Sequence, residues 1–114
     1  MTSGMKTIVY PVKDLPGAKA LYGALLGVEP YVDEAYYVGF RVEGLEVGLD
    51  PNGHSQGLTA PINYWEVEEI EKAVESLVAA GAEVRQPAKD VGGGKLIASV
   101  RDADGNVTGL AQSP

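Results

Sequence analysis

Few side chains in this sequence are suited to metal or nucleophilic chemistry. The chain contains no cysteine, so it offers no thiolate ligand, no disulfide and no cysteine nucleophile. Its single histidine, His54, lies in the turn-forming segment 51–57, where we interpret it as a solvated loop residue. Sites for zinc, copper and non-haem iron depend on several imidazole or thiolate ligands. The sequence therefore indicates a protein without such a site.

A glycine-rich segment, 92–94, precedes Lys95 and suggests a phosphate-binding loop. Backbone amides of glycine next to a lysine can surround an anion. The spacing does not match, because the P-loop pattern needs a glycine five positions before Gly94 and a serine or threonine after the lysine. This chain has Lys89 and Leu96 at those positions. We interpret the segment as a hairpin loop.

Length, composition and charge limit the class of protein and its partners. The chain has 114 residues, of which 45% are hydrophobic, and this is typical of one folded domain. Its formal net charge of −7 repels phosphate backbones and anionic lipids, so neither nucleic acid nor a membrane surface is expected as a partner. The sequence shows no apolar stretch of the roughly 20 residues needed for a membrane span and no signal pattern, which predicts a cytoplasmic protein. The acidity favours cationic small molecules.

Hydrophobic periodicity predicts the order strand, helix and three strands twice. In the first half the strands are 6–12, 30–33, 36–42 and 45–49, with a helix between Asp14 and Gly27 whose apolar positions are Leu15, Ala18, Leu21, Tyr22 and Leu25. In the second half the strands are 62–67, 83–86, 95–101 and 107–112, with a helix over 70–78. Turn formers over 51–60 separate a module at about 5–50 from one at about 61–113. The expected fold is α+β, a single domain of two βαβββ modules.

Short motifs in both halves of the chain match the pattern of one family. They are Val12-Lys-Asp-Leu15, Leu21-Tyr22, Leu26-Gly27 and the closing segment Asp102-Ala-Asp-Gly-Asn106. With them, the chain resembles the vicinal oxygen chelate superfamily, which includes glyoxalase I, bleomycin-resistance proteins and extradiol dioxygenases. The resemblance covers about residues 6–112. It implies curved mixed sheets around a cleft, and we expect a homodimer.

Family enzymes hold a divalent metal in the cleft with four ligands, and the resemblance assigns positions to them. The ligand of the first strand falls on Thr7, and its counterpart in the second half falls on Ile62. The glutamate of the final strand falls on Gly109, and Glu46 is a candidate for the remaining position. Three of these four positions, Thr7, Ile62 and Gly109, carry no imidazole, amide or carboxylate, so we expect neither a metal nor another cofactor. The alternative is a carboxylate-only magnesium or manganese site that uses Glu46 and Glu66.

Alternation along the strands separates core-facing from cleft-facing side chains. On the third strand it places Phe40 and its alternating neighbours, from Tyr36 to Val42, toward the core. On the first, fifth and last strands the resemblance indicates which parity faces the cleft. The predicted ligand-binding residues are Thr7, Val9, Tyr37, Arg41, Tyr64, Glu66 and Gly109.

These features favour a metal-independent small-molecule-binding protein of the glyoxalase and bleomycin-resistance type, with drug sequestration as the leading specific hypothesis. The ligand is expected to be a small organic molecule, cationic or aromatic. Tyr37 and Tyr64 would stack on it or donate hydrogen bonds, while Arg41 and Glu66 would hold its polar ends. The alternative is a lyase, isomerase or dioxygenase of the same superfamily with an atypical or absent metal site, or a metal-free enzyme that uses Glu66 or Tyr64 as an acid–base group. The sequence assigns no catalytic residue.

Overall fold

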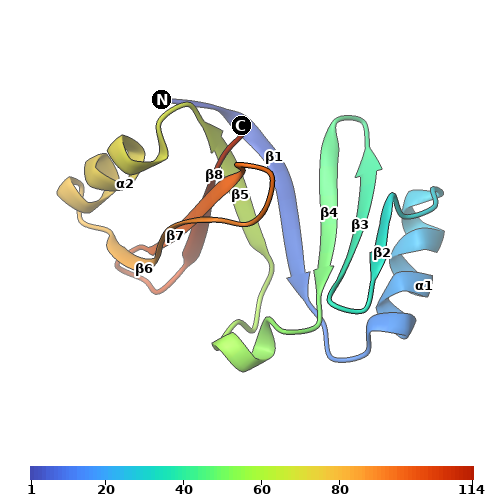
Figure 1. Ribbon diagram of the computed structural model, residues 1–114. Coiled ribbons are helices and arrows are strands. Elements are labelled where there is room, and N and C mark those ends of the chain that lie inside the picture. Colours follow the sequence, from blue (N-terminus) through green and yellow to red (C-terminus); the bar gives the residue numbers. More distant parts are fainter. The chain divides into compact units, whose positions relative to one another are not determined.

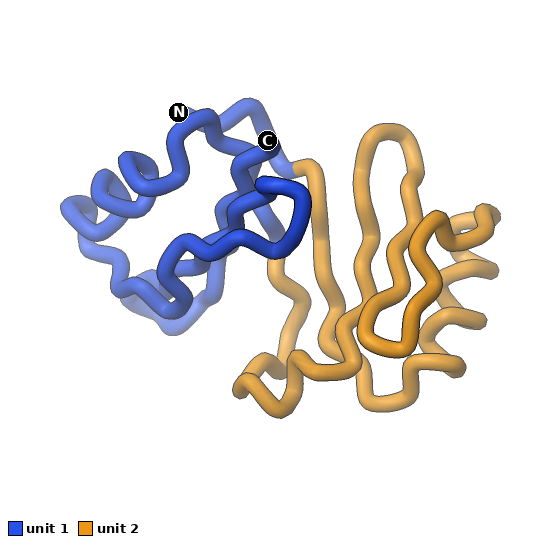
Figure 2. The backbone as a smooth tube through the Cα atoms, viewed as in Figure 1, with its two compact units in different colours: residues 1–5, 63–114 blue, residues 6–62 orange.

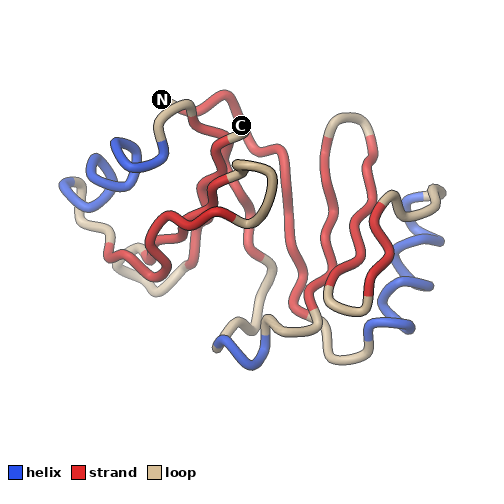
Figure 3. Tube along the Cα trace, viewed as in Figure 1, coloured by secondary structure: helices blue, strands red, loops and turns tan.

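The computed structural model describes residues 1–114 and contains two α-helices and eight β-strands, which confirms the α+β class (Figure 1). The chain forms two compact units (Figure 2). Unit 1 comprises residues 1–5 and 63–114, and unit 2 comprises residues 6–62. Each unit contains one of the two α-helices, and Figure 3 shows the helices, strands and loops along the chain. Neither helix is long and apolar enough to cross a membrane.

Unit 2 is a four-stranded mixed sheet with a helix on one face. The strand order is β2-β3-β4-β1, in which β1 and β4 are parallel and the other pairs are antiparallel. Its elements are β1 (Thr2–Pro11, of which residues 6–11 belong to this unit), α1 (Leu15–Leu26), β2 (Val32–Glu34), β3 (Tyr37–Val42), β4 (Leu45–Asp50) and the short 3-10 helix η1 (His54–Gln56).

The ends of α1 are set by the two residues that the sequence indicated. The Asp14 side chain accepts a hydrogen bond from the Gly17 N–H at 3.1 Å and so caps the first turn. Gly27 adopts the left-handed conformation, with a φ of 71°, and its N–H donates to the Gly23 carbonyl. The helix packs on a core formed by Val38, Phe40, Val47 and Leu49, with Ile8, Tyr10, Val12, Leu15, Ala18, Tyr22, Leu26 and Leu45 around it.

Unit 1 repeats this plan with different residues. Its strand order is β5-β8-β7-β6, in which β5 and β8 are parallel. The elements are β5 (Ile62–Val67, of which residues 63–67 belong to this unit), α2 (Ile70–Ala79), β6 (Glu83–Asp90), β7 (Leu96–Arg101) and β8 (Val107–Gln112). The core consists of Val67, Ile70, Ala73, Ala98 and Leu110, against which Trp65, Val74, Leu77, Ala88 and Leu96 pack. The Gln112 side chain accepts a hydrogen bond from the Ile70 N–H at 2.8 Å and stabilises the start of α2.

One expectation about core-facing side chains is wrong, and the exposed face of α1 differs from what the spacing suggests. Tyr36 is 66% exposed, because residues 35–36 form the turn between β2 and β3 and the strand begins one residue later. Leu21 and Leu25 of α1 are 64% and 73% exposed, although their spacing matched that of the core positions. The helix is apolar on both sides, so spacing alone did not identify the face that packs on the sheet.

Candidate functional site

Four residues of unit 2 form a group that we call the tyrosine cluster: Tyr31, Tyr37, Arg41 and Glu46. Tyr37 and Arg41 lie on β3, and Glu46 lies on β4. Their alternating neighbours pack in the core under α1, so the cluster lies on the opposite face of the sheet.

The carboxylate of Glu46 is the centre of the cluster. One oxygen, Oε1, accepts a hydrogen bond from the Tyr31 hydroxyl, and Oε2 accepts one from the Tyr37 hydroxyl at 2.6 Å. Burial raises the pKa of Tyr31 to about 12, and the hydrogen bond to Glu46 and its negative charge act in the same direction. Tyr31 therefore stays protonated at neutral pH and remains a donor to the carboxylate.

Two glycines form the floor of the tyrosine cluster. A Cβ at Gly48 would lie 2.7 Å from the Cε1 and Cζ atoms of Tyr37, and a Cβ at Gly39 would lie 3.0 Å from Tyr37 and 3.1 Å from Tyr31. The distance at Gly48 is too short for a side chain, and the distances at Gly39 are shorter than most Cβ contacts, so glycine at both positions allows the rings to lie close to the strands. The positions of the two rings thus depend on residues that carry no functional group.

Arg41 supplies the positive charge of the cluster. Its guanidinium carbon lies 3.9 Å from the centroid of the Tyr31 ring, which is a cation–π contact. The ion pairs Lys19–Asp33 and Lys72–Glu69 do not involve Arg41, and no carboxylate pairs with it. The Arg41 side chain is exposed and can reach a ligand.

The structure places two more of the predicted residues beside the cluster. On β1, Thr7 is the register partner of Glu46, and Val9 is the partner of Gly48. Side chains at paired positions point to the same face of a sheet. Thr7, Val9, Tyr37 and Arg41 therefore share one face of unit 2. Sequence reasoning missed Tyr31, and it considered Glu46 only as a metal ligand.

In unit 1, Tyr64 lies on Gly109. The two residues are partners in the parallel β5–β8 pair, and a Cβ at Gly109 would overlap the Tyr64 ring. Ser99, the β7 partner of Gly109, is only 2% exposed and accepts a hydrogen bond from the Arg85 side chain at 3.2 Å. On this face of unit 1, as in the tyrosine cluster of unit 2, an aromatic ring thus packs against a glycine of a strand.

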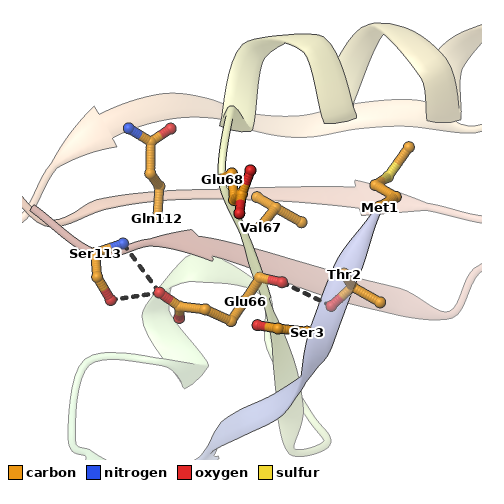
Figure 4. Close-up of a pocket in the computed structure, with 8 residues that line it drawn as sticks. All are labelled: Met1, Thr2, Ser3, Glu66, Val67, Glu68, Gln112 and Ser113. Carbon is orange, nitrogen blue, oxygen red and sulfur yellow. Dashed lines mark hydrogen bonds between the residues drawn. The ribbon is translucent and has the colours of Figure 1, made fainter.

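The remaining predicted residue, Glu66, lies in a pocket of about 590 Å³ in unit 1 (Figure 4). The pocket is lined by Met1, Thr2, Ser3, Glu66, Val67, Glu68, Gln112 and Ser113. The Glu66 side chain accepts hydrogen bonds from the Ser113 N–H at 3.0 Å and from the Ser113 hydroxyl, and the Thr2 hydroxyl donates to the Glu66 carbonyl at 2.7 Å. Most lining side chains are polar, so the pocket suits small hydrophilic groups. Tyr64 and Gly109 are not among its lining residues.

Comparison with known proteins identifies the family. Residues 4–110 match the Glyoxalase/Bleomycin resistance protein/Dioxygenase superfamily. The chain belongs to this superfamily. The match confirms the resemblance that the short motifs indicated. A search of curated protein sequences found no match.

Solved structures of the superfamily share the fold at low sequence identity. A superfamily member from Vibrio splendidus is 15% identical, with a TM-score of 0.69, and the alignment covers 95% of this chain and 97% of that one. Methylmalonyl-CoA epimerase from Mycobacterium tuberculosis is 16% identical, with a TM-score of 0.70 and coverage of 99% and 90%. The Mn(II)-bound glyoxalase from Novosphingobium aromaticivorans is 20% identical, with a TM-score of 0.73 and coverage of 97% and 39%.

The side chains of this chain do not fit the divalent metal of family enzymes. No group of three or more His, Asp or Glu residues could hold a metal ion. Thr7 carries no imidazole, amide or carboxylate, Ile62 carries no ligand atom, and the space a glutamate would need at Gly109 is filled by the Tyr64 ring. Glu46 carries a carboxylate, but both of its oxygens accept hydrogen bonds from tyrosines.

Proposed function

We propose that this protein binds a small organic molecule without a metal and that the ligand contacts the tyrosine cluster. The observation that carries the proposal is the state of Glu46, whose two oxygens both accept hydrogen bonds from Tyr31 and Tyr37. A metal at Glu46 would have to displace these phenols, and no group of three or more His, Asp or Glu side chains is present to hold it. The cluster is therefore suited to direct recognition by aromatic and charged side chains.

The chemistry of the cluster favours an aromatic ligand with a negatively charged group. Tyr31 and Tyr37 offer aromatic surface for stacking. The carboxylate of Glu46 is engaged by both hydroxyls, whereas the Arg41 guanidinium has no carboxylate partner and can bind an anionic group with two parallel hydrogen bonds. The net negative charge of the whole chain favours cationic ligands, but the charged group without a carboxylate partner in the tyrosine cluster, Arg41, is positive.

Calorimetric titration with two matched probes tests this proposal. We suggest 2-naphthoate and 2-naphthylmethylamine, which share a ring system and differ in the sign of their charge, in buffer that contains a chelator. We expect 2-naphthoate to bind the protein in the presence of the chelator. Substitutions Tyr31→Ala and Arg41→Gln should each weaken its binding about tenfold or more, as expected for a central aromatic or arginine contact. Tyr36→Ala is the matched control, because Tyr36 is an exposed tyrosine outside the cluster.

Other results would contradict parts of the proposal. Absence of binding by both probes at high micromolar concentration, or binding only after addition of Mn²⁺, would refute metal-independent recognition. If the amine binds more tightly than 2-naphthoate and the Tyr31→Ala variant binds the amine less tightly, the tyrosine cluster is the binding site. The inference that the ligand is negatively charged would then be wrong. That second outcome would support sequestration of a cationic drug, and a panel of cationic glycopeptide antibiotics would then be the next set of ligands.

A further inference from the structure

The pocket beside Glu66 lies wholly within unit 1 and shares no residue with the tyrosine cluster (Figure 4). Three segments that are far apart in the sequence form it: the start of β1, the end of β5 and the end of β8. Its volume of about 590 Å³ falls within the roughly 300–1,000 Å³ that is typical of small-molecule sites. The apolar lining side chains are Met1 and Val67, and Val67 is only 4% exposed. A ligand here therefore binds through polar contacts rather than through apolar surface.

The Glu66 carboxylate is held in the pocket by one of its two oxygens. Oε1 accepts hydrogen bonds from the Ser113 N–H, at 3.0 Å, and from the Ser113 hydroxyl. Oε2 accepts no hydrogen bond from the chain, and Glu66 forms no ion pair. The Glu66 side chain is partly buried, so solvent screens its charge less than that of a fully exposed carboxylate. The protein thus orients one carboxylate oxygen and leaves the other for a ligand.

The hydroxyl protons of the lining are largely used within the chain. The Ser113 hydroxyl donates to the Glu66 carboxylate, and the Thr2 hydroxyl donates to the Glu66 carbonyl at 2.7 Å. A hydroxyl has one proton to donate, so these two oxygens can only accept a hydrogen bond from a ligand. Glu68 adds a second, exposed carboxylate that forms no ion pair, and the lining contains no lysine, arginine or histidine. The pocket therefore presents mainly acceptors, and two of its groups are negatively charged.

Two neutral donors complete the lining. The Gln112 side-chain oxygen accepts a hydrogen bond from the Ile70 N–H at 2.8 Å, which fixes the amide and leaves its NH₂ group as a donor. The Ser3 hydroxyl is exposed and can also donate. Donors of this kind match the oxygen atoms of alcohols, which accept hydrogen bonds without carrying charge.

We propose that this pocket binds a protonated primary amine that carries hydroxyl groups, the chemistry of an amino sugar. An ammonium group has three donors and no acceptor, which complements Glu66 Oε2, the Glu68 carboxylate and the Ser113 hydroxyl oxygen. The hydroxyl groups of the ligand accept hydrogen bonds from Gln112 and Ser3. The formal charge of −7 attracts such a cation to the chain. The pocket differs from the tyrosine cluster both in its residues and in the charge of its ligand.

An NMR titration of the ¹⁵N-labelled, untagged chain tests the pocket with three matched probes. Glucosamine carries an ammonium group and hydroxyls, glucose lacks the ammonium group, and cyclohexylamine lacks the hydroxyls. The titrations are run at slightly acidic pH, where both amines are protonated. Glucosamine should shift the backbone amide signals of Thr2, Glu66 and Ser113, and it should bind about fivefold or more tightly than either of the other probes.

Two variants test the role of the Glu66 charge. Glu66→Gln should weaken glucosamine binding about fivefold or more, because glutamine keeps an oxygen for Ser113 but replaces the free, charged oxygen by an amide donor. Glu75→Gln is the matched control, since Glu75 is an exposed glutamate of α2 outside the pocket and both substitutions remove one negative charge. The amide spectrum of each variant shows whether it is folded.

Several outcomes would overturn the proposal. They are the absence of glucosamine-induced shifts at the pocket, equal affinity for glucosamine and glucose, and an equal loss of affinity in the two glutamine variants. Binding of cyclohexylamine as tight as that of glucosamine would show that the inferred role of the hydroxyl groups is wrong.

The result is separate from that of the proposed function. Tyr31→Ala alters the tyrosine cluster of unit 2 and should leave glucosamine binding unchanged, whether or not 2-naphthoate binds the protein. Loss of glucosamine binding in Tyr31→Ala, with no loss in Glu66→Gln, would assign the amine to the tyrosine cluster and overturn this inference.

Discussion

Gly48→Ala should destabilise the protein through the tyrosine cluster. The new Cβ would lie 2.7 Å from two ring atoms of Tyr37, so the ring must move. Crowding of this kind costs about 1–3 kcal/mol. Movement of the ring also weakens the hydrogen bond to the charged Glu46, and such bonds contribute about 1.5–3 kcal/mol. Because the ring can keep part of this bond, we expect the free energy of unfolding to fall by about 2–3 kcal/mol.

When the Tyr37 ring is absent, Gly48→Ala should raise the free energy of unfolding instead of lowering it. A Tyr37→Ala background removes the three atoms that lie nearest to the new methyl group, and Gly48 does not have a positive φ, so we expect alanine to fit the strand. Alanine in a strand is then favoured over glycine by about 0.5–1 kcal/mol. Urea unfolding of the four proteins of this double-mutant cycle measures a coupling of about 3 kcal/mol. An equal loss of stability in both backgrounds would refute the contact between Tyr37 and Gly48.

Three other substitutions follow from the same structure. Gly23→Ala should raise the free energy of unfolding by about 1 kcal/mol, because the new Cβ would lie 3.7 Å from Phe40, an ordinary contact, and alanine favours a helix; thermal unfolding measures it. Tyr31 has a pKa of about 12 in the folded state and 10.0 as its ordinary value, so it stabilises the fold fully below pH 10 and loses this contribution as the pH rises toward 12. Urea unfolding from pH 9 to pH 12 measures how the free energy of unfolding falls, and Tyr31→Phe should make this fall smaller. A fall of the same size in the variant would exclude Tyr31 as its source. Gly109→Glu should not create a metal site, because the Tyr64 ring fills the space; it should instead destabilise the protein by about 1–3 kcal/mol, and tight binding of one Mn²⁺ by this variant would contradict the packing.

Strand alternation predicted much of the open face of unit 2, for a simple physical reason. Phe40 is fully buried and Val38 is nearly so, and the residues next to them on the strand must point the other way. The expected sides of Tyr37 and Arg41 followed from this pattern. Whether these residues bind a ligand stays a prediction.

The position of Tyr31 could not be predicted from alternation, because it precedes a strand of only three residues. Its hydrogen-bond partner, Glu46, lies fifteen residues further along the chain, and only the order of β2, β3 and β4 brings the two together. The signal that could have indicated the cluster is the pair Gly39 and Gly48, since glycine inside a strand often marks the close approach of another group. No pattern in the sequence indicated that Leu21 and Leu25 of α1 are exposed, because apolar residues lie on both faces of this helix.

The metal content of the purified protein tests metal independence most directly. The chain should be incubated with Mn²⁺, Ni²⁺ or Zn²⁺, dialysed, and measured by elemental mass spectrometry beside a Glu46→Gln variant. We predict far less than one metal ion per chain for both proteins, because the Glu46 oxygens accept hydrogen bonds from Tyr31 and Tyr37 and no group of three or more His, Asp or Glu side chains could hold a metal ion. One ion per chain that survives dialysis, and is lost in Glu46→Gln, would contradict the proposed metal-independent site.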